Sequence, residues 1–169
     1  VCRDCRSPPK YGASLLAAVD TALQEGRLPA GALSAAARYL GVGDLLVRND
    51  VRWDKSGGAR PLSVATRVAA EPGLTLEGVN GNPGEGVLTT PAQPRAELDL
   101  PPLQRYAVQD PRDIVRTESG RGLVLVDGDG DAVTSLHAAG IVDGTQPLLL
   151  LGDLDKSTFA QAVRDGGRI

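Results

Sequence analysis

Two short, wholly apolar stretches in the last third of the chain place the strongest constraint on its fold. They are Leu123–Val126 and Pro147–Leu151, and a segment of helical periodicity lies between them. A strand that is apolar at every position must be buried on both faces, and parallel strands joined by a crossover helix are buried in this way. The sequence therefore predicts an α/β fold with a mainly parallel sheet flanked by helices.

The remaining pattern divides the chain into two lobes. Apolar residues at helical spacing, stopped by glycines, predict helices over residues 13–25, 32–40 and 61–70. Short apolar runs predict strands at 45–47, 74–79 and 106–108, whereas prolines and glycines interrupt any regular pattern over much of the middle of the chain. We therefore expect a flexible leading segment at residues 1–10, a first α/β lobe at 11–79, a loop-rich connection at 80–104 and a second lobe of β-α-β-α order at 105–169.

Charge and hydropathy exclude two classes of partner. The 169 residues carry a formal net charge of -3 and contain no stripe of Lys and Arg, so nucleic acid is not expected to bind. No apolar run approaches the roughly 20 residues that a membrane-spanning helix needs, so we expect no direct membrane insertion by this segment. The sequence contains no Met, even at position 1, which is typical of a piece of a longer protein.

Cys2 and Cys5 form a C-x-x-C pair in the leading segment. A structural zinc site needs four ligands, and the only other nitrogen or sulfur candidate is His137, which we expect to be a surface or half-buried structural residue. A thioredoxin-type site would follow a strand and open a helix, but Pro8-Pro9 follows here. We expect a local disulfide or two free thiols that are dispensable for folding, because so short a loop constrains the unfolded chain little. No cofactor is expected.

The acidic turn Asp127-Gly128-Asp129-Gly130-Asp131 has several interpretations. An EF-hand is excluded because its sixth and twelfth positions hold alanines, and a dinucleotide fingerprint lacks its third glycine. A phosphohydrolase of the haloacid-dehalogenase type resembles this stretch in its D-x-D, with Asp127 as nucleophile and Asp129 as acid; it would need a magnesium ion, for which Asp127, Asp129 and Asp131 are the candidate ligands. A capped turn from strand to helix explains all five residues without catalysis.

Trp53 is the only tryptophan, and it lies in a glycine-containing loop after the strand expected at 45–47. Sugar rings stack their C–H faces on exposed aromatic side chains, and Asp, Asn and Arg bond the hydroxyl groups. Ligands also commonly bind beyond the ends of strands. Packing of the indole against the lobe is the alternative, because Trp is highly buried on average. The candidate glycan-contact residues are Arg48, Asn49, Asp50, Trp53 and Asp54.

Three stretches of the chain carry a family resemblance. They are YLGVGDLLVRND (39–50), RPLSVATRVAAEPGLTLEGV (60–79) and VDGDGDAVTSLHAAGIVDGTQPLLLLGDL (126–154). Together, and in this order, they resemble the extracytoplasmic part of the large actinobacterial α-(1→3)-arabinofuranosyltransferases. The R-N-D stretch at residues 48–50 is the most specific part.

The resemblance implies a parent enzyme with many membrane spans that transfers arabinofuranose from a polyprenyl-phosphate donor to cell-wall arabinan. The acidic catalytic residue of such enzymes lies in the membrane domain, so the resemblance assigns no catalytic residue to this chain. It implies a non-catalytic scaffold on the extracytoplasmic side, whose partners are the rest of the parent enzyme and possible acceptor arabinan. A stand-alone hydrolase using Asp127 and an interaction module for other envelope proteins are the alternatives.

Overall fold

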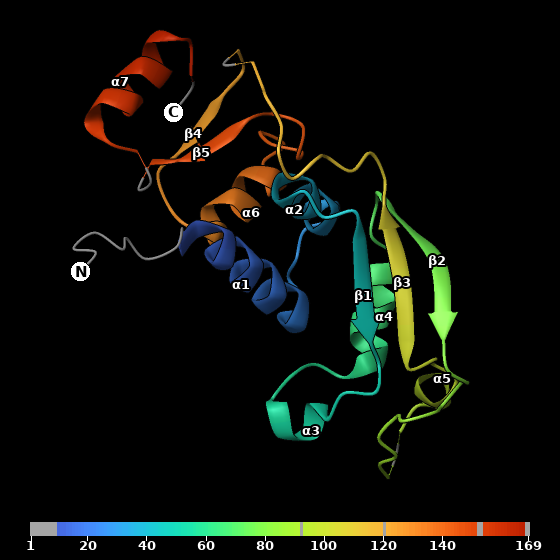
Figure 1. Ribbon diagram of the computed structural model, residues 1–169. Helices are drawn as coiled ribbons and strands as arrows, with labels where there is room; N and C mark the ends of the chain where they lie inside the picture. Colours follow the sequence, from blue (N-terminus) through green and yellow to red (C-terminus); the bar gives the residue numbers. More distant parts are fainter. Residues whose placement is uncertain (1–9, 92, 120, 152–153, 168–169) are drawn as a thin grey trace, which may run out of the picture.

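The computed structural model describes residues 10–91, 93–119, 121–151 and 154–167 (Figure 1). Its helices are α1 (Lys10–Glu25), α2 (Ala32–Leu40), α3 (Trp53–Ser56), α4 (Pro61–Ala69), α5 (Arg95–Leu98), α6 (Gly130–Ala138) and α7 (Lys156–Arg164). Its strands are β1 (Asp44–Arg48), β2 (Leu74–Asn80), β3 (Leu103–Val108), β4 (Val124–Val126) and β5 (Leu148–Leu150). The prediction about Cys2 and Cys5 lies outside the described residues.

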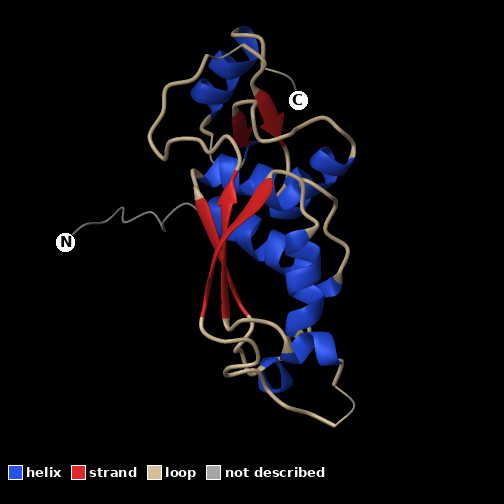
Figure 2. Cartoon of the chain, turned by 90° about the vertical axis from the view of Figure 1, so that its right-hand side faces the viewer, coloured by secondary structure: helices blue, strands red, loops and turns tan. Residues whose placement is uncertain are grey.

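The first sheet has three strands in the order β1-β3-β2, and β3 is antiparallel to both neighbours. Because β1 and β2 both oppose β3, they run parallel to each other and form a split β-α-β unit with α4 as the crossover helix. Figure 2 shows the three strands together with the helices to one side. The inner face packs on α4 through the buried side chains of Val47, Val68 and Tyr106.

The second sheet pairs β4 with β5 in parallel, with Leu125 opposite Leu149. One face of β4 packs through Val124 and Val126 into the core formed with α1, α2 and α6. The other face packs through Leu125 against Ala162 of α7. The predicted parallel pairing is therefore confirmed, although only β4 is buried at every position, because Leu149 of β5 is exposed.

The prediction of a mainly parallel sheet is wrong for the chain as a whole. Three of its strands form the antiparallel sheet, and only β4 and β5 pair in parallel. The reason lies in β3, whose side chains alternate between buried and accessible positions as expected for a strand with one covered face. That strand inserts between β1 and β2, a placement that depends on contacts across the fold and not on local periodicity. β3 pairs with β1 and β2, which belong to the expected first lobe. The division of the chain into two lobes remains a prediction.

The final helix, α7, is capped by Asp155. Its carboxylate accepts hydrogen bonds from the backbone N–H groups of Ser157 and Thr158 at 2.9 and 2.8 Å, and from the Ser157 hydroxyl at 2.7 Å. Of these interactions, the hydrogen bond from the Ser157 side chain contributes most, and together they lower the pKa of Asp155 from 3.8 to about 2. The ionised form is therefore the one that caps the helix.

We expect the start of α7 to loosen in acid because of this cap. Since the folded-state pKa lies below the unfolded value, the stabilisation is complete above 3.8 and is lost as the pH falls toward 2. In the Asp155→Asn variant the cap cannot titrate, although Asn remains a good N-cap residue. The measurement is an NMR titration of the Ser157 and Thr158 amides in both proteins. If the amide shifts of Ser157 and Thr158 changed with pH in the same way in both proteins, the prediction would be contradicted.

Candidate functional site

The candidate segment follows the end of β1 and is anchored to α1. Its single turn of helix, α3, ends at Gly57, whose left-handed φ of 71° suits glycine. The backbone N–H of Ala59 then donates a hydrogen bond to Gln24 of α1 at 2.7 Å. This contact holds the loop between α3 and α4 against α1, and it thereby positions Trp53.

The two carboxylates of the segment, of which Asp50 is half-buried and Asp54 exposed, are already paired with neighbouring guanidinium groups. Asp50 accepts two hydrogen bonds from Arg48 at 3.0 and 2.9 Å, and Asp54 accepts two from Arg52 at 3.0 and 2.8 Å. The hydrogen bonds from Arg48 and Arg52 lower the pKa of Asp50 and of Asp54, respectively. Both carboxylates are thus ionised acceptors held in fixed orientations at the end of β1.

Asn49, between them in sequence, lies inside the fold. Its side chain is fully buried, and Nδ2 donates to the carbonyl of Pro101 at 2.8 Å and to Oε1 of Gln104 at 3.1 Å. Its backbone N–H donates to the carbonyl of Pro102 at 2.8 Å. Asn49 therefore fastens the end of β1 to the chain that enters β3, and it is not presented at the surface.

Trp53 is half-buried and forms a stack with Arg60. The Arg60 guanidinium lies 4.9 Å from the centre of the indole ring. Arg60 also forms an ion pair with Glu97 of α5 at 3.0 Å, and the Glu97 side chain is fully buried. The row Trp53-Arg60-Glu97 thus joins the consecutive α3 and α4 to α5, which is distant in sequence.

A hollow of about 360 Å³ lies beside Trp53, between α1, β1, α3 and α4. Its floor is aliphatic, with Leu33, Val47 and Val68 among its lining residues, whereas Asp20 and Arg48 supply polar groups. An aromatic edge over an aliphatic floor with a few polar groups is typical of a small-molecule or sugar-binding pocket.

Buried polar atoms without a hydrogen-bond partner also gather at this end of the molecule. Such atoms are rare in folded proteins, and each calls for an explanation. Within the described part of the chain they are Asn49 Oδ1, Trp53 Nε1, Arg60 Nη2, Gln93 Nε2 and Glu97 Oε1. This concentration marks the region around Arg60 as the candidate binding region.

Sequence reasoning did not identify Arg60, Gln93 or Glu97. A local signal existed for α5, because Pro94 followed by helix-forming residues indicates the start of a helix. Nothing local, however, indicates that Glu97 is buried, since a glutamate is normally exposed unless a cation from elsewhere in the fold pairs with it.

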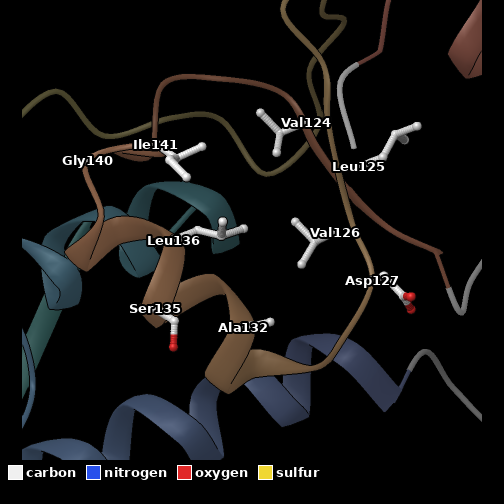
Figure 3. Close-up of a pocket in the computed structure, with 9 residues that line it drawn as sticks. All are labelled: Val124, Leu125, Val126, Asp127, Ala132, Ser135, Leu136, Gly140 and Ile141. Carbon is white, nitrogen blue, oxygen red and sulfur yellow. The ribbon is translucent and has the colours of Figure 1, made fainter.

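The acidic turn at residues 127–131 starts α6. The Asp129 side chain accepts a hydrogen bond from the backbone N–H of Asp131 at 3.1 Å, which makes Asp129 the helix cap. Asp127 is exposed and points away from the hollow between β4 and α6 (Figure 3). Within the described ranges, no group of three or more His, Cys, Asp or Glu side chains is placed to hold a metal ion. No observation supports the hydrolase alternative.

His137 is half-buried and has a structural position. Its Nδ1 lies 3.0 Å from the carbonyl oxygen of Val142, and its Nε2 lies 3.0 Å from that of Ala30. The ring therefore joins the end of α6 to the loop between α1 and α2. None of the helices that the structure describes has the length and apolar run required to cross a membrane.

Comparison with known families identifies the class of protein to which this fold and site belong. Residues 9–168 match the family model described as alpha-(1→3)-arabinofuranosyltransferase, N-terminal GT-C domain. The chain therefore belongs to this glycosyltransferase family, in agreement with the resemblance of its sequence. No curated protein matches the chain.

Two solved structures share the fold. One is the single-particle cryo-EM structure of arabinofuranosyltransferase AftD from Mycobacteria, at 22% identity and a TM-score of 0.54, covering 83% of this chain and 11% of that chain. The other is a mutant of AftD from Mycobacteria, at 23% identity and a TM-score of 0.61, covering 84% of this chain and 12% of that chain. The chain thus spans a small part of the length of the solved enzymes it matches.

Proposed function

We propose that this chain is a non-catalytic, extracytoplasmic part of an arabinofuranosyltransferase that supports the acceptor arabinan during cell-wall synthesis. Its membership of the family supports the link to the enzyme. The observation that carries the supporting role is the Trp53–Arg60 stack beside the aliphatic hollow, to which Asp20 and Arg48 contribute polar groups. The rest of the parent enzyme and the glycan are the proposed partners.

The geometry suits a neutral, hydroxylated ligand. An indole that is held in place offers an apolar surface to sugar C–H groups at little entropic cost. The ion-paired carboxylates accept hydrogen bonds from hydroxyl groups, and Arg48 donates them. The net charge of -3 is compatible with a neutral arabinan and disfavours a polyanion.

Titration with arabinan oligosaccharides tests this role. We expect binding of about millimolar affinity, roughly 4 kcal/mol, with a change in the fluorescence of Trp53 and shifts of its indole NMR signal. Because Trp53 is the only tryptophan, the fluorescence comes from the site alone. A xylan oligosaccharide of equal length serves as the control ligand. The absence of any response near the solubility limit of the arabinan would contradict the glycan role.

The purified chain by itself is expected to have no transferase activity. The proposed role is support of the acceptor, and the family resemblance implies a catalytic acid outside this segment. The measurement is transfer of radiolabelled arabinose from a lipid-linked donor to an arabinan acceptor, with the full enzyme as the positive control. Transfer by the chain alone would overturn the assignment of a non-catalytic role.

A further inference from the structure

Among the residues that the structure describes, no strand pairs with β4 on the side opposite β5, so β4 forms an open edge of this sheet. The two strands have three residues each, and the backbone N–H of Val124 donates to the carbonyl of Pro147, next to β5, at 2.9 Å. In a parallel ladder, alternate residues direct both backbone groups to the same neighbour. The N–H and C=O of Leu125 consequently point away from β5, and within the described residues no backbone hydrogen bond outside this ladder involves Leu125.

This edge borders a hollow of about 760 Å³. Its wall is mostly apolar and comes from β4, from α6 and from the turn after α6. Figure 3 shows Leu136 and Ile141 across the hollow from β4, with Asp127 directed away. Ile141 is 53% exposed although it stands beside a buried strand. The lining residues other than β4 itself are Asp127, Ala132, Ser135, Leu136, Gly140 and Ile141.

We propose that the open edge of β4 receives a short third strand with apolar side chains, contributed by a segment of the same polypeptide outside residues 1–169. The added strand bonds the N–H and C=O of Leu125 and places side chains between β4 and Ile141. This is recognition by strand addition, in which main-chain hydrogen bonds attach the segment and pockets select alternate side chains. It turns a two-stranded sheet, which is marginal by itself, into a three-stranded one.

The size of the edge favours a tethered strand over a separate partner. Three residues of strand and one hollow offer far less contact area than the roughly 1,200 Å² of a small stable interface between proteins. A segment of the same chain avoids the loss of translational freedom, because tethering gives it a high effective concentration. In the two matched AftD structures, only 11% and 12% of the chain corresponds to this sequence. A parent polypeptide of similar length would contain many other segments that could provide the added strand.

Photo-cross-linking in the full-length polypeptide tests the proposal. A benzoyl-phenylalanine probe replaces Ile141 at the rim of the hollow, and in a control protein it replaces Val115, which is 89% exposed and does not line the hollow. We expect the probe at 141 to form an intramolecular cross-link to one apolar segment outside residues 1–169, identified by mass spectrometry, and the probe at 115 to form no such link. A cross-link only to another protein, to a second copy or within residues 1–169, or no cross-link at all, would overturn the proposal.

Hydrogen exchange provides a second, independent readout. In the full-length polypeptide, the Leu125 amide should exchange at least tenfold faster after Ile141→Asp, because the carboxylate disfavours an apolar strand in the hollow. The amide of Val126 points toward β5, so its exchange should change little and reports on the integrity of the sheet. Equal exchange of Leu125 in both proteins, with Val126 still protected, would also overturn the proposal.

Discussion

Replacing Arg60 with methionine is expected to lower the free energy of unfolding by about 3 to 5 kcal/mol. The change leaves the carboxylate of Glu97, whose side chain is fully buried, without the guanidinium that lies 3.0 Å away. An uncompensated buried charge is far more costly than the loss of an exposed ion pair. The stack on Trp53 is lost as well, which contributes about 0.5 to 1 kcal/mol. Denaturant unfolding followed by Trp53 fluorescence and by circular dichroism measures the loss.

Two further variants distinguish the cost of leaving a buried carboxylate unpaired from the cost of losing an exposed ion pair. Arg105→Met removes an arginine that pairs with Asp44 and Glu77 on the exposed face of the first sheet, so its cost should be about 1 kcal/mol or less. The double variant Arg60→Met, Glu97→Met should recover much of the stability lost in the single variant, because no unpaired charge remains. A cost for Arg60→Met equal to that for Arg105→Met would show that Glu97 is not held in the way described.

Replacing Gly130 with alanine is expected to cost about 3 kcal/mol, although it adds a single methyl group. A Cβ at this position would lie 2.4 Å from the Ser14 carbonyl oxygen and 2.6 Å from the Leu15 Cα. Both are backbone atoms of α1, so no side chain can move aside and α6 must shift. The shift also strains the hydrogen bond from the Gly130 N–H to the Ser14 hydroxyl, which is 3.0 Å long. Thermal and denaturant unfolding measure the cost.

Gly43→Ala is the matched control for that substitution. A Cβ at Gly43 meets no atom within 4 Å, so the change should alter the free energy of unfolding by less than about 0.5 kcal/mol. If Gly130→Ala proved as well tolerated as Gly43→Ala, the close approach of α1 and α6 would be refuted. Gly130 thus has a packing role in the acidic turn, where the sequence alone left catalytic and structural interpretations open.

Several elements of this protein could be predicted from the sequence because their causes are local. The range of α2 was predicted as observed, and that of α4 differs by one residue at its end. Asp129 and Asp155 cap helices as short polar side chains before a helix are expected to do. The apolar runs at β4 and β5 correctly predicted two strands that pair in parallel.

The glycan-contact role of the candidate site remains a prediction. Trp53 does lie beside a hollow at the end of β1, as its position in the sequence suggested. The side chains that fix it were not predicted, because Arg60 and Glu97 are 37 residues apart and meet only when α5 folds against the start of α4. Asn49 belongs to the most specific sequence stretch, yet its burial depends on Pro101 and Gln104, which lie across the sheet.

Periodicity, capping and turn residues are properties of a few neighbouring positions, so the sequence by itself determined most helices, the paired apolar strands and the family. The tertiary structure decided which distant segments meet. It placed β3 between β1 and β2, buried Glu97 beneath Arg60, and brought the backbone of α1 against Gly130. These outcomes depend on the packing of complementary surfaces and on the pairing of backbone and charged groups across the fold. Local sequence patterns therefore do not predict them.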